Sequence, residues 1–179
     1  RFTYNFRIAA WCNTEDSASA SPFSNPINAS TACGIVDAFP FAENFDAMTG
    51  VTSGNALPLC WSHINTCTSS TYNYYPTVYA GSSYAASGNN SMKFYSYYSS
   101  SIVPQDQIAI LPEMNDVSSL RMNFNARKYS SSATSYANFI VGVMSDPEND
   151  STFVPVKTIT PSSTDYESFE VRFNSYEGD

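Results

Sequence analysis

The sequence predicts an all-β protein whose main part is a jelly-roll β-sandwich. Helical periodicity is nearly absent, and short runs of alternating apolar and polar residues are separated by clusters of Ser, Asn, Pro and Gly. Charged residues make up only 13% of the chain, so Ser, Thr, Asn and Tyr must supply most of the polar surface. This balance is typical of extracellular β proteins, whose strands favour Thr and aromatic residues and whose turns favour Asn and Ser.

The first segment predicts a β-hairpin. Residues 4–10 alternate between apolar and polar side chains, and a second strand is expected over residues 24–31 after a polar loop. Such a hairpin is too small to bury a core by itself. The chain then begins a second, longer run of strands, so we expect one module at residues 1–33 and another at residues 39–179.

The strands expected after residue 39 are longer. Residues 107–111 form an apolar run, and residues 120–126 alternate so that one face is buried and the other is wet. Residues 138–144 are apolar on both faces, which predicts a central strand, and residues 169–173 alternate again. Runs of this length and spacing favour two packed sheets, most simply a jelly roll.

Charge excludes several classes of partner. The net charge is −8, with 8 lysines and arginines against 16 aspartates and glutamates. Nucleic acids and anionic membranes are bound through clusters of basic residues, so neither is expected as a partner. No window reaches the roughly 20 consecutive apolar residues that a bilayer-spanning helix needs, so no membrane insertion is expected.

Catalytic chemistry finds little support in the residues. The single histidine, His63, has no G-x-S-x-G nucleophile motif to serve. Carboxylate pairs such as Glu113 with Asp116 are interpreted as surface charge or turn caps. We therefore expect the chain not to be an enzyme.

The four cysteines allow three pairings. Local pairing, Cys12 with Cys33 and Cys60 with Cys67, is the simplest prediction and implies an oxidising compartment. Inert thiols and a zinc site are the alternatives. A zinc site needs closer ligand spacing, such as C-x2-C, and only His63 is available to help. We expect an extracellular or cell-surface location, with an export signal upstream of residue 1.

Tyrosines predict a binding surface. The chain has 13 of them, many between residues 72 and 98. An exposed tyrosine offers a flat apolar face and a hydroxyl, which suit stacking on sugars or packing on a protein partner. The alternative is that tyrosine simply fills half-buried strand positions. The candidate ligand-binding residues are Tyr74, Tyr75, Tyr79, Tyr97 and Tyr98.

Two family resemblances add to these patterns. Residues 1–33 resemble the last two strands of a fibronectin type III domain. The second module resembles the MAM-like jelly rolls of the choice-of-anchor or cleaved-adhesin type, from surface and secreted proteins of Bacteroidetes. The motifs that carry this second resemblance lie, in order, at residues 40–46, 57–61, 88–94, 110–113, 120–124, 139–146, 166–171 and 176–178.

The resemblance implies a non-catalytic adhesion or binding module of a larger bacterial protein. Its ligand would be a glycan or an extracellular protein, and other modules of the same polypeptide would be its neighbours. A structural spacer that positions a catalytic domain is the alternative. Relatives hold structural calcium, which implies Glu43 and Asp46 as ligands, with the acidic turn 146–150 as a second candidate. The family pattern also implies that the jelly roll lacks its last strand or strands here.

Overall fold

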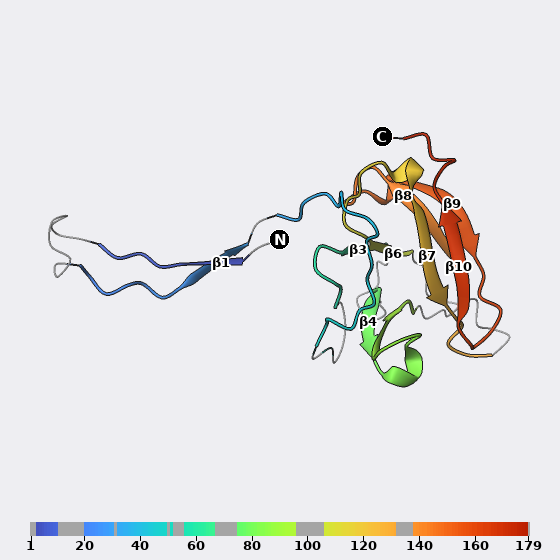
Figure 1. The fold of residues 1–179 in the computed structure, drawn as a ribbon, viewed down its shortest axis with the longest axis horizontal. Helices are drawn as coiled ribbons and strands as arrows, with labels where there is room; N and C mark the ends of the chain where they lie inside the picture. The colour runs from blue at the N-terminus through green and yellow to red at the C-terminus, as the bar shows by residue number, and fades with distance from the viewer. Residues whose placement is uncertain are drawn as a thin grey trace. The chain divides into compact units, whose positions relative to one another are not determined.

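The computed structural model describes residues 3–10, 20–30, 32–49, 51, 56–66, 75–95, 106–131 and 138–178. The chain divides into two compact units, Arg1–Gly34 and Ile35–Asp179. The division between them falls in the segment that separates the two predicted modules. Each unit is described by itself below (Figure 1).

The first unit is a long hairpin. Strand β1 (Thr3–Phe6) pairs antiparallel with β2 (Ile27–Ser30). Beyond the ladder, the Ser24 backbone amide donates to the Ile8 carbonyl at 2.8 Å, while the Ile8 amide donates to Ser24 Oγ at 3.1 Å. The Ser24 hydroxyl thus accepts the hydrogen bond that a backbone carbonyl would accept in a regular ladder. The two segments of the hairpin therefore stay paired past the ends of β1 and β2. Tyr4, Phe6 and Ile8 are exposed, in agreement with the expectation that this hairpin buries no core.

Within its described residues, the second unit consists of antiparallel strand pairs joined by loops and three 3-10 helices. Among the described residues there is no α-helix, so the predicted all-β class is confirmed. The strands are β3 (Ser62–Asn65), β4 (Thr77–Ala80), β5 (Asn90–Lys93), β6 (Gln107–Ile110), β7 (Arg121–Ala126), β8 (Phe139–Met144), β9 (Phe153–Ile159) and β10 (Glu167–Arg172). The 3-10 helices are η2 (Ser82–Tyr84), η3 (Val117–Ser119) and η4 (Asp150–Thr152).

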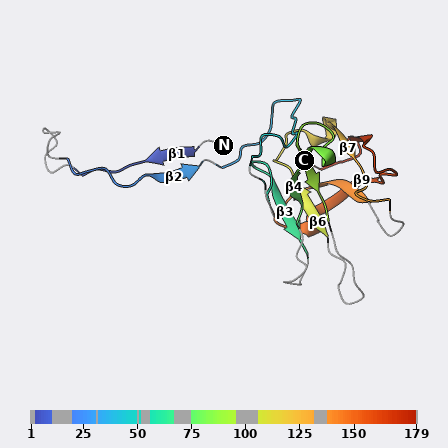
Figure 2. The same cartoon turned by 90° about the horizontal axis from the view of Figure 1, so that it is seen from below.

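The described strands form separate two-stranded ladders. β3 pairs with β6, β4 with β5, β7 with β10 and β8 with β9. Figure 2 shows β3 and β6 side by side, with β4 near them. A parallel bridge between Val36 and Met114 ties the segment before β3 to the segment after β6. The jelly-roll connection of these ladders stays a prediction.

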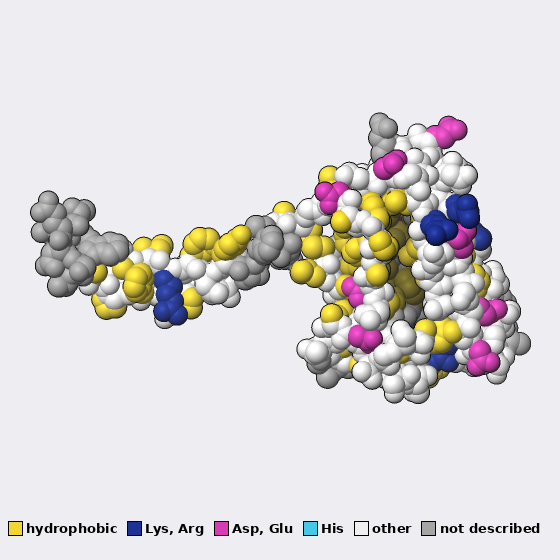
Figure 3. All heavy atoms as spheres, viewed as in Figure 1, with side chains coloured by type: hydrophobic (Ala, Val, Ile, Leu, Met, Phe, Trp, Pro, Cys, Tyr) yellow, Lys and Arg dark blue, Asp and Glu magenta, His cyan; other side chains and the backbone are white. Residues whose placement is uncertain are grey.

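The core lies between the ladders of the C-terminal half. Ile159 of β9, Val171 of β10 and Phe173 are its most buried members. Its flanking apolar side chains come from η3, from all four strands β7–β10 and from Leu120. Hydrophobic side chains also gather in a hollow between the segments labelled β6 and β7, so the apolar interior reaches the surface there (Figure 3).

The alternation predicted for residues 120–126 is confirmed on β7. Met122 and Phe124 pack on the core, whereas Asn123 and Asn125 are exposed. The prediction for residues 138–144 holds only in part, because Ile140 of β8 is 52% exposed.

Strand β8 depends on a glycine for its pairing with β9. The register shifts between Val141 and Gly142, which marks a β-bulge. A Cβ atom added to Gly142 would lie 2.4 Å from the Val154 backbone oxygen and 2.5 Å from the Phe153 ring. Only glycine lets the two strands approach so closely.

The predicted local disulfides are wrong for the two described cysteines. Cys33 is bonded to Cys60, whereas sequence proximity had suggested Cys12 and Cys67 as their partners. Proximity along the chain measures only the length of loop to be closed, and the fold decides which Cβ atoms come within bonding distance. Cys12 and Cys67 lie outside the described residues. Among the helices of the described segments, none is long and apolar enough to cross a membrane.

Candidate functional site

The predicted calcium ligand Asp46 holds a turn in place. Its Oδ1 accepts hydrogen bonds from the backbone amides of Asn89, at 2.7 Å, and Asn90, at 3.0 Å. The turn enters β5 through Gly88, which has a φ of 65° in the left-handed region. A Cβ atom on Gly88 would lie 1.7 Å from Asp46 Oδ2, so the carboxylate occupies the space that a side chain would need.

Asn90 completes this connection from the other side. It is only 7% exposed, and its Nδ2 donates to the backbone carbonyls of Phe45, at 2.8 Å, and Met48, at 2.9 Å. Glu43 acts within the same loop, where its Oε1 accepts from the Phe45 amide at 2.5 Å. Both predicted metal ligands therefore stabilise backbone that would otherwise have unsatisfied donors.

The donor set around Glu43 and Asp46 is small for calcium, which takes six to eight oxygen ligands. No group of three or more His, Cys, Asp or Glu side chains comes together within the described segments. In the 146–150 turn, Asp146 Oδ1 accepts from the Glu148 amide at 2.9 Å, as a turn cap does. Calcium binding stays a prediction from the family resemblance, and calorimetric titration with millimolar calcium tests it.

Two of the five predicted tyrosines, Tyr75 and Tyr79, lie in the described part of the chain, and they make different contacts. Tyr79 lies on β4 and is 40% exposed. Tyr75 packs edge-on against His63, with ring centroids 4.4 Å apart, so it serves a local contact. Tyr74, Tyr97 and Tyr98 lie outside the described residues.

Tyr79 belongs to a larger surface cluster that we call the aromatic patch. It joins tyrosines from β4, from η2, from the segment after β5 and from the segments that flank the β7–β10 ladder, together with two cationic side chains. Its members are Tyr79, Tyr84, Lys93, Tyr95, Arg127, Tyr129 and Tyr166.

Tyrosine rings form the centre of the patch. The Tyr79 and Tyr84 rings meet edge to face, with centroids 5.3 Å apart. Tyr84 and Tyr129 are stacked at 6.1 Å with 21° between their planes. Tyr129 is nevertheless 76% exposed. A ring that rests on its neighbour yet stays this exposed leaves most of its surface for a ligand.

The register of the β4–β5 ladder places Lys93 in the patch. Lys93 lies opposite Thr77, two residues before Tyr79 on the same face of the ladder. Its Nζ lies 4.9 Å from the Tyr79 ring centroid and 5.8 Å from that of Tyr95. Both distances lie within the range of a cation–π interaction, so the two rings attract the ammonium group and hold it at this side of the patch.

Arg127 joins three segments of the chain at the other side of the patch. Its guanidinium carbon lies 5.2 Å from the Tyr166 ring and 5.7 Å from the Tyr84 ring. Nη1 donates to the Thr164 carbonyl at 3.0 Å, and Nη2 lies 3.5 Å from the Ser83 carbonyl as a second donor. Tyr166 Oη donates to the Tyr84 backbone carbonyl. The patch is therefore held by hydrogen bonds before any ligand arrives.

The cations of the patch make no ion pair within the described parts of the chain, where Glu170 pairs with Arg172 at 2.8 Å and with Arg121 at 3.8 Å. Glu167, at the start of β10, is held elsewhere: it accepts from the Ser162 hydroxyl, at 2.7 Å, and from the Ser162 amide. These hydrogen bonds, together with the nearby Lys128, lower the pKa of Glu167 below its ordinary 4.5.

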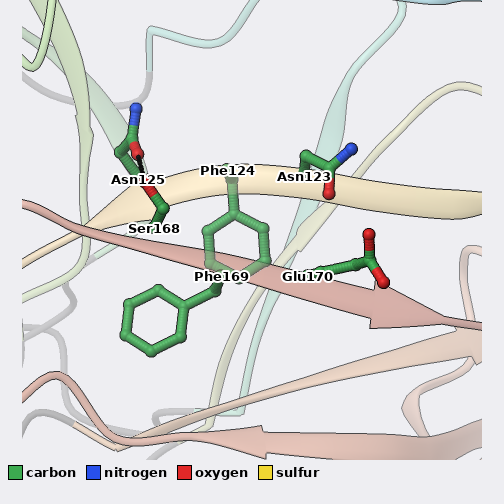
Figure 4. Close-up of a pocket in the computed structure, with 6 residues that line it drawn as sticks. All are labelled: Asn123, Phe124, Asn125, Ser168, Phe169 and Glu170. Atoms are coloured by element: carbon green, nitrogen blue, oxygen red, sulfur yellow. Dashed lines mark hydrogen bonds between the residues drawn. The ribbon is translucent and has the colours of Figure 1, made fainter.

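A shallow depression of about 420 Å³ crosses the β7–β10 ladder (Figure 4). Asn123 and Asn125 of β7 line it with Ser168 and Glu170 of β10, beside Phe124 and Phe169. Ser168 Oγ donates to Asn125 Oδ1 at 2.7 Å, and Glu170 accepts from Arg172. Asn125, Ser168 and Glu170 already have polar partners and the depression is open, so it is a weaker site than the aromatic patch.

Sequence reasoning found part of the patch. Tyr84 and Tyr95 belong to the tyrosine-rich stretch, but Tyr129 and Tyr166 lie far from it in the chain. Folding brings them to Tyr84, and no local pattern reports that approach. The spacing of Lys93 and Tyr95 could have predicted one contact, because residues two apart on a strand lie on the same face.

Comparison with protein-family models, with curated proteins and with solved structures finds no match for this chain.

Proposed function

We propose that this chain is a non-catalytic, extracellular binding module and that its aromatic patch binds a glycan. The exposed Tyr129 ring, stacked on Tyr84, carries the proposal. Sugar rings present apolar C–H faces and polar hydroxyl edges, and tyrosine offers the matching combination of a flat face and a hydroxyl. The Cys33–Cys60 disulfide supports an oxidising, extracellular setting.

The fixed geometry of the patch favours binding over a purely structural role. Tyr84 is held between Tyr79 and Tyr129, and the Arg127 hydrogen bonds keep the surrounding loops in place. Ordering side chains on binding costs free energy, so a surface ordered in advance binds more tightly. A spacer between domains has no need of such an ordered, exposed row of rings.

Affinity electrophoresis in gels that contain soluble polysaccharides tests the proposal. We expect at least one polysaccharide to retard the protein and Tyr129→Ala to reduce that retardation. Tyr4→Ala is the matched control, because Tyr4 is an exposed tyrosine of the first unit. Far-UV circular dichroism checks that both variants fold. Retardation that survives Tyr129→Ala, or a panel in which no polysaccharide retards the protein, contradicts the proposal and leaves the spacer as the better account.

A further inference from the structure

We infer that the ligand of the aromatic patch is an anionic polysaccharide, one that carries carboxylate or sulfate groups. This inference rests on the proposed glycan-binding function and names its substrate class. The observation behind it is that both cations of the patch face tyrosine rings, without a carboxylate partner within the described segments.

Charge complementarity selects the ligand. The chain carries a net charge of −8 with only 8 lysines and arginines, so most of its surface repels polyanions. Two of these basic residues, Lys93 and Arg127, nevertheless lie in one patch. The depression on the β7–β10 ladder differs, because its Glu170 already pairs with Arg121 and Arg172. In the patch, two cations without a carboxylate partner in the described segments lie beside exposed tyrosine rings, so an anionic sugar would find positive charge and a stacking surface together there.

Lys93 is the cation of the patch whose hydrogen-bond donors are most available. It is exposed, and its ammonium group has three donors. The Tyr79 and Tyr95 rings, 4.9 and 5.8 Å from Nζ, attract the cation without accepting a strong hydrogen bond. The donors of Lys93 thus stay available for a carboxylate or sulfate oxygen.

Arg127 gives the patch its second positive charge in a fixed position. Its bond to the Thr164 carbonyl and its rings, Tyr84 and Tyr166, orient the guanidinium. The Tyr84 ring contacts the Tyr79 ring, which also contacts Lys93, and the Arg127 guanidinium lies over the Tyr84 ring as well. A polysaccharide whose sugars stack on the central rings would thus meet a positive charge on each side of them.

Two carboxylates flank Tyr166 in the sequence, those of Asp165 and Glu167, and neither forms an ion pair with Lys93 or Arg127 within the described segments. Glu167 accepts from the Ser162 hydroxyl and amide and from the Ser163 amide. The Glu167 carboxylate is therefore engaged by hydrogen bonds from residues 162 and 163.

Affinity electrophoresis with matched polymers tests the inference. Dextran and dextran sulfate share a backbone and differ in charge, and polygalacturonate supplies carboxylates in place of sulfates. We expect dextran sulfate or polygalacturonate to retard the protein more than dextran does. The comparison of dextran sulfate with polygalacturonate then shows whether the patch prefers sulfate or carboxylate groups.

Charge variants sharpen the test. Lys93→Gln is expected to weaken binding to the anionic polymer about fivefold, near the upper end for an exposed ionic contact. Lys93→Arg should restore it. Arg121→Gln is the matched control, because it removes the same charge from an exposed residue outside the patch and leaves the closer Arg172–Glu170 pair in place.

Two results overturn the inference. One is retardation by dextran that equals or exceeds retardation by both anionic polymers and still depends on Tyr129, in which case the glycan-binding function stands and the anionic ligand does not. The other is an equal loss of affinity in Lys93→Gln and Arg121→Gln, which would indicate attraction to overall charge. If no polymer binds in a Tyr129-dependent way, the glycan-binding function itself fails.

Discussion

Substitution of Asp46 is expected to unfold the loop that precedes β5 and to lower global stability. Asp46→Ala removes the acceptor of two backbone amides, those of Asn89 and Asn90. A hydrogen bond to a charged group contributes about 1.5–3 kcal/mol, and a donor left without a partner adds a desolvation cost. Because Asp46 is half-buried and water reaches part of the turn, we expect a loss of about 2–4 kcal/mol in the free energy of unfolding.

Asp46→Asn separates the charge from the hydrogen bonds. The amide keeps an oxygen acceptor, and neutral hydrogen bonds are roughly half as strong as charged ones. We expect this variant to lose about half as much stability as Asp46→Ala. Asp165→Ala is the control, because Asp165 is an exposed aspartate in a different turn.

Urea denaturation followed by tryptophan fluorescence measures these differences. Trp61 is a suitable reporter, since its ring lies 5.9 Å from that of Phe45, next to Asp46. Far-UV circular dichroism gives an independent transition. If Asp46→Ala and Asp165→Ala unfold at the same urea concentration, Asp46 does not stabilise the turn and our account of the loop is refuted.

Three further predictions concern other parts of the fold. Gly142→Ala places a Cβ atom 2.4 Å from a β9 carbonyl and should destabilise the chain by about 1–3 kcal/mol in urea, whereas Gly34→Ala, with nothing within 4 Å, should have no comparable effect. Glu167 has a lowered pKa, so its stabilisation is complete at pH values above its ordinary 4.5 and is lost as the pH falls through the folded value; the stability gap to Glu167→Gln should shrink on acidification. Non-reducing peptide mapping should recover a Cys33–Cys60 crosslink, and a Cys12–Cys33 crosslink would contradict the structure.

Local patterns predicted the β strands well, because alternation along one strand reports which face is buried. The pattern at residues 120–126 is the clearest case: Met122 and Phe124 are inside, and Asn123 and Asn125 are outside. Side chains two apart on a strand share a face whatever the rest of the chain does, so this inference needs no knowledge of tertiary structure.

Long-range contacts escaped prediction. The sequence predicts Asp46 as a calcium ligand, but its hydrogen-bond partners, Asn89 and Asn90, lie more than 40 positions away in the chain. A ligand role and a turn-binding role look the same in sequence, since both use carboxylate oxygens. The stacking of Tyr129 on Tyr84 and the bond between Cys33 and Cys60 likewise depend on folding.

The pairing of β7 with β10 also sets the spacing of the surface rings. Arg127 follows β7 directly and Tyr166 directly precedes β10, so the register of this ladder fixes where both side chains lie. A slip of one residue would move Met122 and Phe124 from the core to solvent, which the hydrophobic effect opposes strongly. The apolar core therefore determines the geometry of the ligand surface. By fixing the register of β7 and β10, it keeps the Arg127 guanidinium and the Tyr166 ring at a constant distance.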